Sequence, residues 1–141
     1  MLADEFAKEV DFFSVGTNDL TQYLLAVDRG NELISGMYQQ LHPAVIRALK
    51  WTIDKAHSHN IPVSICGELG SMMLAIPILV GMGIDEISVN PSVFPEIKQI
   101  VRGINYKDAK VLADKAVTLI TESEICSEVE AFYEKVVISE N

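Results

Sequence analysis

Residues 11–19 read Asp-Phe-Phe-Ser-Val-Gly-Thr-Asn-Asp, and this stretch decides the fold class. Its first part is a short apolar run that a glycine ends, which is typical of a buried β-strand. Thr17, Asn18 and Asp19 follow at once and offer cap chemistry for a helical turn through Leu20–Ala26. The stretch therefore predicts a strand that leads directly into a helix, with polar side chains at the junction.

Two further segments repeat this pattern of apolar strand, polar corner and helix. A long helix over 44–59 leads to a strand over 61–66, which ends at a glycine before a helix over about 72–81. A third strand over 85–89 leads into a helix over about 93–102. Strands separated by helices indicate a parallel sheet, and these strands lack alternation, which predicts cover on both faces. In parallel α/β folds, chemistry lies at the carboxyl ends of the strands, where the polar corners are.

Helical segments flank the three units. Residues 2–9 have the rhythm of the end of an amphipathic helix, and two more helices are expected over about 106–121 and 127–136. Three parallel strands cannot close a barrel of eight, and the first helix has no strand before it. We therefore expect the chain to be a fragment of a larger α/β domain.

Composition and charge exclude several classes of protein. With 141 residues, 49% of them hydrophobic, the chain is expected to be globular. Its net charge of −9 argues against a nucleic-acid partner and disfavours an anionic membrane surface. The sequence has no membrane span, no basic secretory leader and only two cysteines, so we expect a cytoplasmic chain with free thiols.

Asn18, Asp19 and Arg29 are candidates for binding chemistry. An amide and a carboxylate at a strand end suit a hard cation such as Mg²⁺, although the alternative is that they only cap the next helix. Arg29 lies in a loop over 28–31, where its guanidinium suits phosphate or carboxylate. The alternative for Arg29 is a solvated loop side chain.

Cys66 is the candidate for catalytic chemistry. It ends the second strand before Gly67 and Glu68, and such a thiol can act as a nucleophile or an acid. The alternative is a small core residue. Cys126 lies in a polar helical tail and is interpreted as structural, and the histidines show no metal-ligand spacing, with His42 expected to start a helix.

Taken together, the strand corners resemble the phosphoenolpyruvate-utilising enzymes. Residues 11–23 are similar to the signature of that family, and residues 65–68, Ile-Cys-Gly-Glu, resemble its catalytic cysteine corner. Residues 24–32 and 41–45 resemble one branch, Enzyme I of the bacterial sugar phosphotransferase system. The resemblance is dense over about 9–103 and thinner in the tail, about 104–141.

The resemblance implies a fold and an activity. The family has a phosphoenolpyruvate-binding (β/α)8 TIM barrel, of which residues 1–141 would be the last three β-α units plus C-terminal helices, a partial barrel. Enzyme I transfers phosphate from phosphoenolpyruvate to an enzyme histidine and on to HPr, and forms homodimers. The histidine-bearing N-terminal domain that meets HPr is expected outside this chain, so we expect the chain alone to be inactive.

The resemblance also assigns residue roles. It implies that Asp19 is one of two carboxylate ligands of Mg²⁺, the other lying outside this chain, and that Asn18 and Arg29 contact the phosphoryl group. Cys66 would protonate the enolate of pyruvate after phosphoryl loss. Residues 69–72, Leu-Gly-Ser-Met, depart from the Met-Ala-Gly-Asp that is usual in Enzyme I.

Two other interpretations stay open. The dikinase relatives, pyruvate phosphate dikinase and phosphoenolpyruvate synthase, share the corners at 16–19 and 66–68, although residues 28–31 favour Enzyme I. Alternatively, the chain is a non-catalytic dimerisation or assembly module. A truncated barrel would have two unpaired strand edges, and exposed edges recruit partners.

Overall fold

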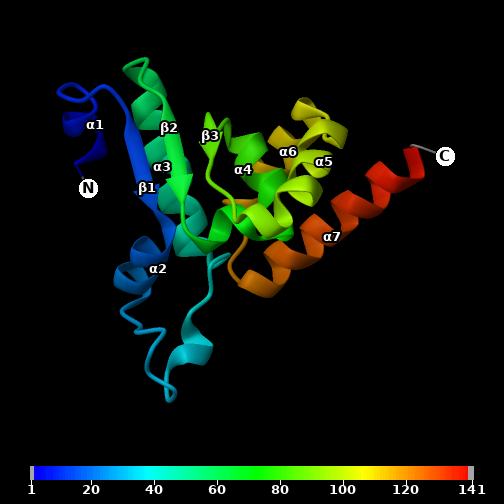
Figure 1. The fold of residues 1–141 in the computed structure, drawn as a ribbon, viewed down its shortest axis with the longest axis horizontal. Helices are drawn as coiled ribbons and strands as arrows, with labels where there is room; N and C mark the ends of the chain where they lie inside the picture. The colour runs from blue at the N-terminus through cyan, green and yellow to red at the C-terminus, as the bar shows by residue number, and fades with distance from the viewer. Residues whose placement is uncertain (1, 140–141) are drawn as a thin grey trace.

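Three parallel strands form a small sheet in the computed structural model, which describes residues 2–139 and side chains up to residue 135 (Figure 1). β1 (Phe13–Gly16), β2 (Val63–Cys66) and β3 (Glu86–Ile87) lie in the order β1-β2-β3. The register pairs Gly16 with Cys66, so β1 and β2 end level with each other. The predicted parallel α/β arrangement is confirmed.

Helices connect the strands and continue beyond them. In chain order they are α1 (Ala3–Phe6), α2 (Thr17–Leu25), η1 (Ser35–Met37), α3 (Pro43–Ser58), η2 (Glu68–Ser71), η3 (Met73–Ala75), α4 (Ile76–Met82), η4 (Pro91–Val93), α5 (Phe94–Gly103), α6 (Tyr106–Ala116) and α7 (Glu122–Ser139). The helix expected over about 72–81 begins later than predicted, because the 3₁₀ turn η3 takes up residues 73–75 and α4 starts at Ile76. Pro77 lies in the first turn of α4, where its missing N–H costs no helical hydrogen bond.

α3 forms where the sequence predicts it. His42 caps its start, since Nδ1 accepts a hydrogen bond from the backbone N–H of Ala44 at 3.1 Å, and Pro43 opens the first turn. The side chains that face the core, Val45 and Leu49 among them, are fully buried. This apolar stripe fixes α3 against the sheet.

Only one face of the sheet packs against the core of the described residues. Along β2, Val63 and Ile65 are fully buried, whereas Ser64 is half-buried and Cys66 is exposed. The expectation of cover on both faces is therefore wrong for the described residues. A short apolar strand carries no local signal that separates one covered face from two.

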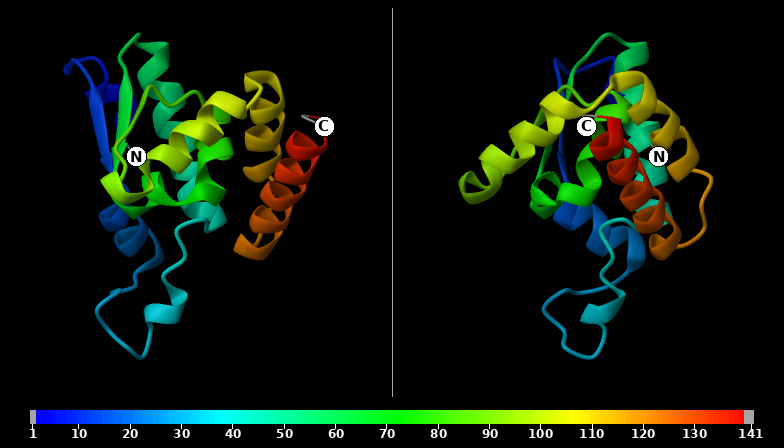
Figure 2. Two further views of the ribbon diagram at one scale, coloured as in Figure 1. Left: turned by 45° about the vertical axis from the view of Figure 1, so that its right-hand side comes forward. Right: turned by 90° about the vertical axis from the view of Figure 1, so that its right-hand side faces the viewer.

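The C-terminal helices share the same core. α7 lies at the far side of the molecule from β1 in the left view of Figure 2, and α6 packs against both α4 and α7. Ile125 and Val129 of α7 belong to the cluster of buried residues that includes Leu49 of α3. None of the described helices is both long and apolar enough to cross a membrane.

Candidate active site at the carboxyl edge of the sheet

Two polar residues of α2 hold the corner that follows β2. Thr17 donates a hydrogen bond from Oγ1 to the carbonyl oxygen of Cys66 at 2.9 Å. The side-chain oxygen of Asn18 accepts one from the backbone N–H of Glu68 at 3.0 Å. The alternative that these residues only cap α2 is wrong, because Gly16 is the cap residue and no side chain makes a capping bond there. The first turn of α2 instead fixes the backbone around Cys66.

Gly67 allows this close approach. Its φ of +110° is a left-handed value that side chains disfavour. A Cβ at this position would lie 2.6 Å from the Thr17 Oγ1 and 2.9 Å from the Asn18 Oδ1. Position 67 therefore requires glycine, both for its backbone conformation and because a side chain would not fit.

The two cysteines lie in different environments. Cys66 is exposed at the end of β2, with Sγ 3.8 Å from the carbonyl oxygen of Val15, so the alternative of a core residue is wrong. Cys126 is partly buried, and this burial, together with the carboxylates of Glu122 and Glu130, raises the pKa of its thiol. Cys66 is accessible to a substrate, and its role as an acid stays a prediction.

Arg29 reaches the same corner through Glu68. Its Nη1 lies 2.7 Å from Oε1 of Glu68, and its backbone N–H donates to Oε1 of Gln22 at 3.1 Å. The other carboxylate oxygen of Glu68 accepts a hydrogen bond from Nε2 of Gln40 at 2.9 Å. Arg29 is thus placed by an ion pair, and the alternative of a purely solvated side chain is wrong.

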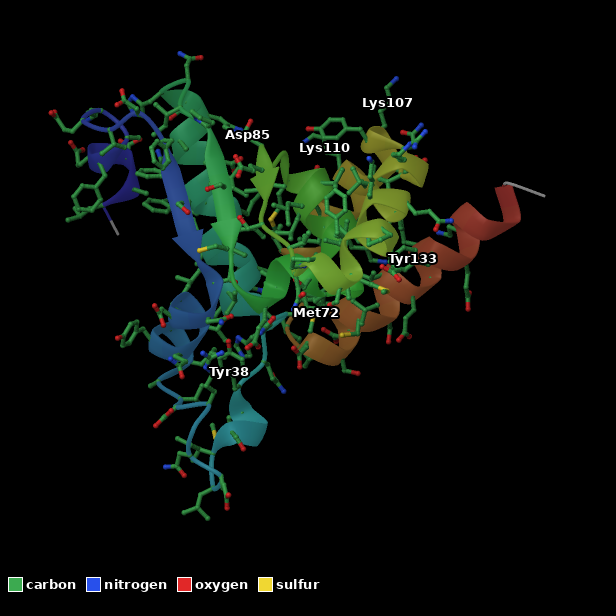
Figure 3. The ribbon with its side chains drawn as sticks, in the orientation of Figure 1. Tyr38, Met72, Asp85, Lys107, Lys110 and Tyr133 are labelled. Carbon is green, nitrogen blue, oxygen red and sulfur yellow. The ribbon has the colours of Figure 1, made fainter. Side chains whose placement is uncertain are left out.

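The loop that carries these residues projects beyond the carboxyl ends of the strands. It connects α2 to α3 over residues 26–42, and both views in Figure 2 show it extending away from the sheet. Its two ends meet at Glu68, through Arg29 and Gln40. In Figure 3, Tyr38 lies at this end of the molecule and Asp85 at the other. Sequence analysis missed Gln40, because no local pattern marks it as part of this corner.

Asp19 lies at the same edge without joining this network. Its side chain is exposed in the first turn of α2. An open hollow of ≈ 360 Å³ at this edge is lined by Asn18, Glu68 and Asn90 among others, and Asp19 is not among its lining residues. Within residues 2–139, no group of three or more His, Cys, Asp or Glu side chains could hold a metal ion. The role of Asp19 as a ligand of Mg²⁺ stays a prediction.

A second polar cluster lies at the opposite end of the sheet. Oδ2 of Asp85 accepts a hydrogen bond from the backbone N–H of Val63 at 2.8 Å. The same oxygen lies 2.9 Å from Nε2 of His57. Burial opposes ionisation of Asp85, but the contacts with His57 and Val63 outweigh it and lower the pKa of the carboxyl. The cluster ties α3, β2 and β3 together, far from Cys66.

The strand order and the corner around Cys66 agree with a family comparison. A sequence model of the family described as "PEP-utilising enzyme, PEP-binding domain" matches residues 1–106, which include all three strands and the site. The chain belongs to this family of phosphoenolpyruvate-utilising enzymes. The resemblance inferred from the strand corners is confirmed.

Individual relatives share one name, phosphoenolpyruvate-protein phosphotransferase. The chain is 51% identical over 126 residues to that of Haemophilus influenzae and 48% identical over 132 residues to that of Buchnera aphidicola subsp. Acyrthosiphon pisum. It is 41% identical over 131 residues to that of Staphylococcus carnosus. These alignments cover 89%, 94% and 93% of this chain but only 22%, 23% and 23% of the relatives. The chain spans under a quarter of their length.

Proposed function

We propose that this chain is the phosphoenolpyruvate-binding segment of a phosphotransferase that passes phosphate from phosphoenolpyruvate to an enzyme histidine and on to HPr. The observation that carries the proposal is that Asn18 and Arg29 both bond Glu68, two residues after the exposed Cys66, in a chain of this family. The names of the relatives favour this activity over a dikinase.

The binding roles follow from the chemistry of the side chains. The amide of Asn18 and the guanidinium of Arg29 would contact the phosphoryl oxygens as negative charge develops there. The Asp19 carboxylate would be one ligand of Mg²⁺, with the other ligands coming from outside this chain, from water and from substrate. When bound, Mg²⁺ would neutralise charge on the phosphate oxygens.

Cys66 would act after phosphoryl transfer. The bond between phosphorus and the enol oxygen breaks, a bond to the histidine nitrogen forms, and the electron pair stays on the enolate of pyruvate. The thiol of Cys66 then gives its proton to the methylene carbon, which makes pyruvate, and the thiolate regains a proton from water. The exposure of Cys66 at the end of β2 supports this role.

The proposal extends to the surrounding fold. The three strands would be the last three β-α units of a (β/α)8 barrel, in a cytoplasmic homodimer. The open face of β2, which carries Ser64 and Cys66, supports a barrel interior. A hollow of ≈ 480 Å³ beside β1, whose lining includes Leu2, Phe6 and Trp51, lies on the helix-covered face and supports a further β-α unit next to β1.

A chimera tests the function. This chain replaces the matching segment of the Haemophilus influenzae relative, and pyruvate formation from phosphoenolpyruvate is measured with Cys66→Ala or Cys126→Ala. General acid catalysis contributes about 10²- to 10⁴-fold, so we expect Cys66→Ala to lose about that factor and Cys126→Ala to keep most activity. Circular dichroism checks that both variants fold. Equal rates for the two variants would overturn the assignment of Cys66.

The 141 residues alone should show no turnover, because the phosphorylated histidine would lie outside them. Mg²⁺-dependent loss of phosphoenolpyruvate with the purified chain would contradict this.

An assembly module is the second candidate function. Exposed apolar side chains lie next to both outer strands of the sheet, namely Phe12 before β1 and Phe94 after β3. Exposed apolar groups and unpaired strand edges favour contact with another protein chain. We therefore expect the chain to self-associate in solution. Light scattering that shows a monomer at roughly tens of micromolar protein would contradict this expectation.

A further inference from the structure

Glu68 is held at three points at the carboxyl edge of the sheet. Its backbone N–H donates to Asn18, Oε2 accepts from Gln40 at 2.9 Å, and Oε1 pairs with Arg29 at 2.7 Å. Both carboxylate oxygens therefore have donors. The side chain is nonetheless 60% exposed, and that of Arg29 is 47% exposed, so solvent and ligands can reach the pair.

Gln40 is the fixed part of this network. It is only 7% exposed, and its Nε2 donates to Glu68 and, at 3.4 Å, to the hydroxyl of Tyr38. Its Oε1 is buried and has no hydrogen-bond partner among the described residues. Because Gln40 is anchored in the fold, it keeps the carboxylate of Glu68 in place whether or not Arg29 is bound to it.

We propose that Glu68 is a positioning residue that holds the guanidinium of Arg29 over the site and competes with an incoming phosphoryl group for it. The inference rests on the proposed function, which assigns Arg29 to the phosphoryl oxygens. A guanidinium offers the same planar set of N–H donors to carboxylate and to phosphate. A phosphoryl group that binds Nη1 must therefore displace Oε1 of Glu68.

The strength of the competition follows from exposure. Exposed ion pairs contribute about 0.2–1 kcal/mol, which corresponds to a factor of about 1.4 to 5 in a binding constant. Removing the charge of Glu68 should thus tighten the binding of an anion by that factor. A purely structural role for Glu68 predicts no tightening.

The test uses the full 141-residue chain with inorganic phosphate as the probe. Phosphate is titrated while the Nε–Hε resonance of Arg29 is followed by NMR, with Arg29→Lys to assign the signal. Glu68→Gln keeps a group that can contact Gln40 and removes the charge. Glu96→Gln is the matched control, because it removes one exposed carboxylate from the first turn of α5, away from Arg29.

We expect the Kd for phosphate to fall by a factor of about 1.4 to 5 in Glu68→Gln and to stay unchanged in Glu96→Gln. Equal Kd values in all three proteins would overturn the competition while leaving the proposed function intact. If phosphate moves the Arg29 signal in none of them, the assignment of Arg29 to the phosphoryl group is wrong, and the inference falls with it.

Discussion

Replacing Gly67 with alanine should weaken the fold and break the corner around Cys66. The backbone of Gly67 has φ +110° and ψ −172°, a region that is nearly restricted to glycine. The new Cβ would also lie 2.6 Å from Oγ1 of Thr17 and 2.9 Å from Oδ1 of Asn18. Both oxygens must shift, and each makes a hydrogen bond that fixes this corner.

The size of the effect follows from these contacts. Strain in such a backbone region costs about 1–3 kcal/mol. Each of the two hydrogen bonds is worth about 0.5–1.5 kcal/mol. We therefore expect Gly67→Ala to lower the free energy of unfolding by about 2–6 kcal/mol, a large part of the stability of a typical domain.

Urea unfolding of the 141-residue chain measures this loss. With a slope of about 2 kcal/mol per molar, the midpoint should fall by about 1–3 M. Gly36→Ala is the matched control, since a Cβ there would meet nothing within 4 Å. The control should unfold at the wild-type midpoint or slightly above it. Equal midpoints for Gly67→Ala and Gly36→Ala would refute the reasoning.

Three further outcomes test other contacts. Because the pKa of Asp85 is lowered in the folded chain, its ionised form adds stability above about pH 4, and this contribution disappears as the pH falls further. Asp85→Asn should remove this acid dependence when stability is measured by urea unfolding at several pH values. Burial raises the pKa of Tyr133 to about 12, so the chain should lose stability as the pH rises above 10. Tyr133→Phe should abolish that loss. At neutral pH the variant should be about 1 kcal/mol less stable, because it lacks the hydrogen bond from the Tyr133 hydroxyl to the Met73 carbonyl oxygen. Arg47 donates to the carbonyl oxygens of Val117 and Leu119 at 2.8 and 2.7 Å, so Arg47→Ala should cost about 1–2 kcal/mol, and an unchanged midpoint would mean that water replaces both bonds fully.

Local signals in the sequence predicted the sheet and its corners. An apolar run that ends at glycine identified β1 and β2, because strand burial and chain reversal depend on neighbouring residues. His42 and Pro43 likewise marked the start of α3. These features need no knowledge of distant contacts.

Contacts between distant segments could not be predicted in this way. Arg29 and Glu68 are 39 residues apart, and Gln40 and Glu68 are 28 apart, so no local pattern indicates that they meet. The pair of His57 and Asp85 was missed for the same reason. The family resemblance indicated which residues have roles, whereas the structure indicates which neighbours hold them.

The packing of α4 against α6 has a consequence for where this polypeptide can be divided. The family match ends at residue 106, but a Cβ at Gly81 of α4 would overlap the backbone carbonyl of Ala109 in α6. Ala109 and Ala113 are fully buried in that contact. A recombination joint or a truncation at residue 106 would remove α6 and leave the part of α4 around Gly81 open to water. The segment that the family match delimits is therefore shorter than the segment that packs as one unit, which includes α6. Only the longer segment can be inherited or transplanted intact.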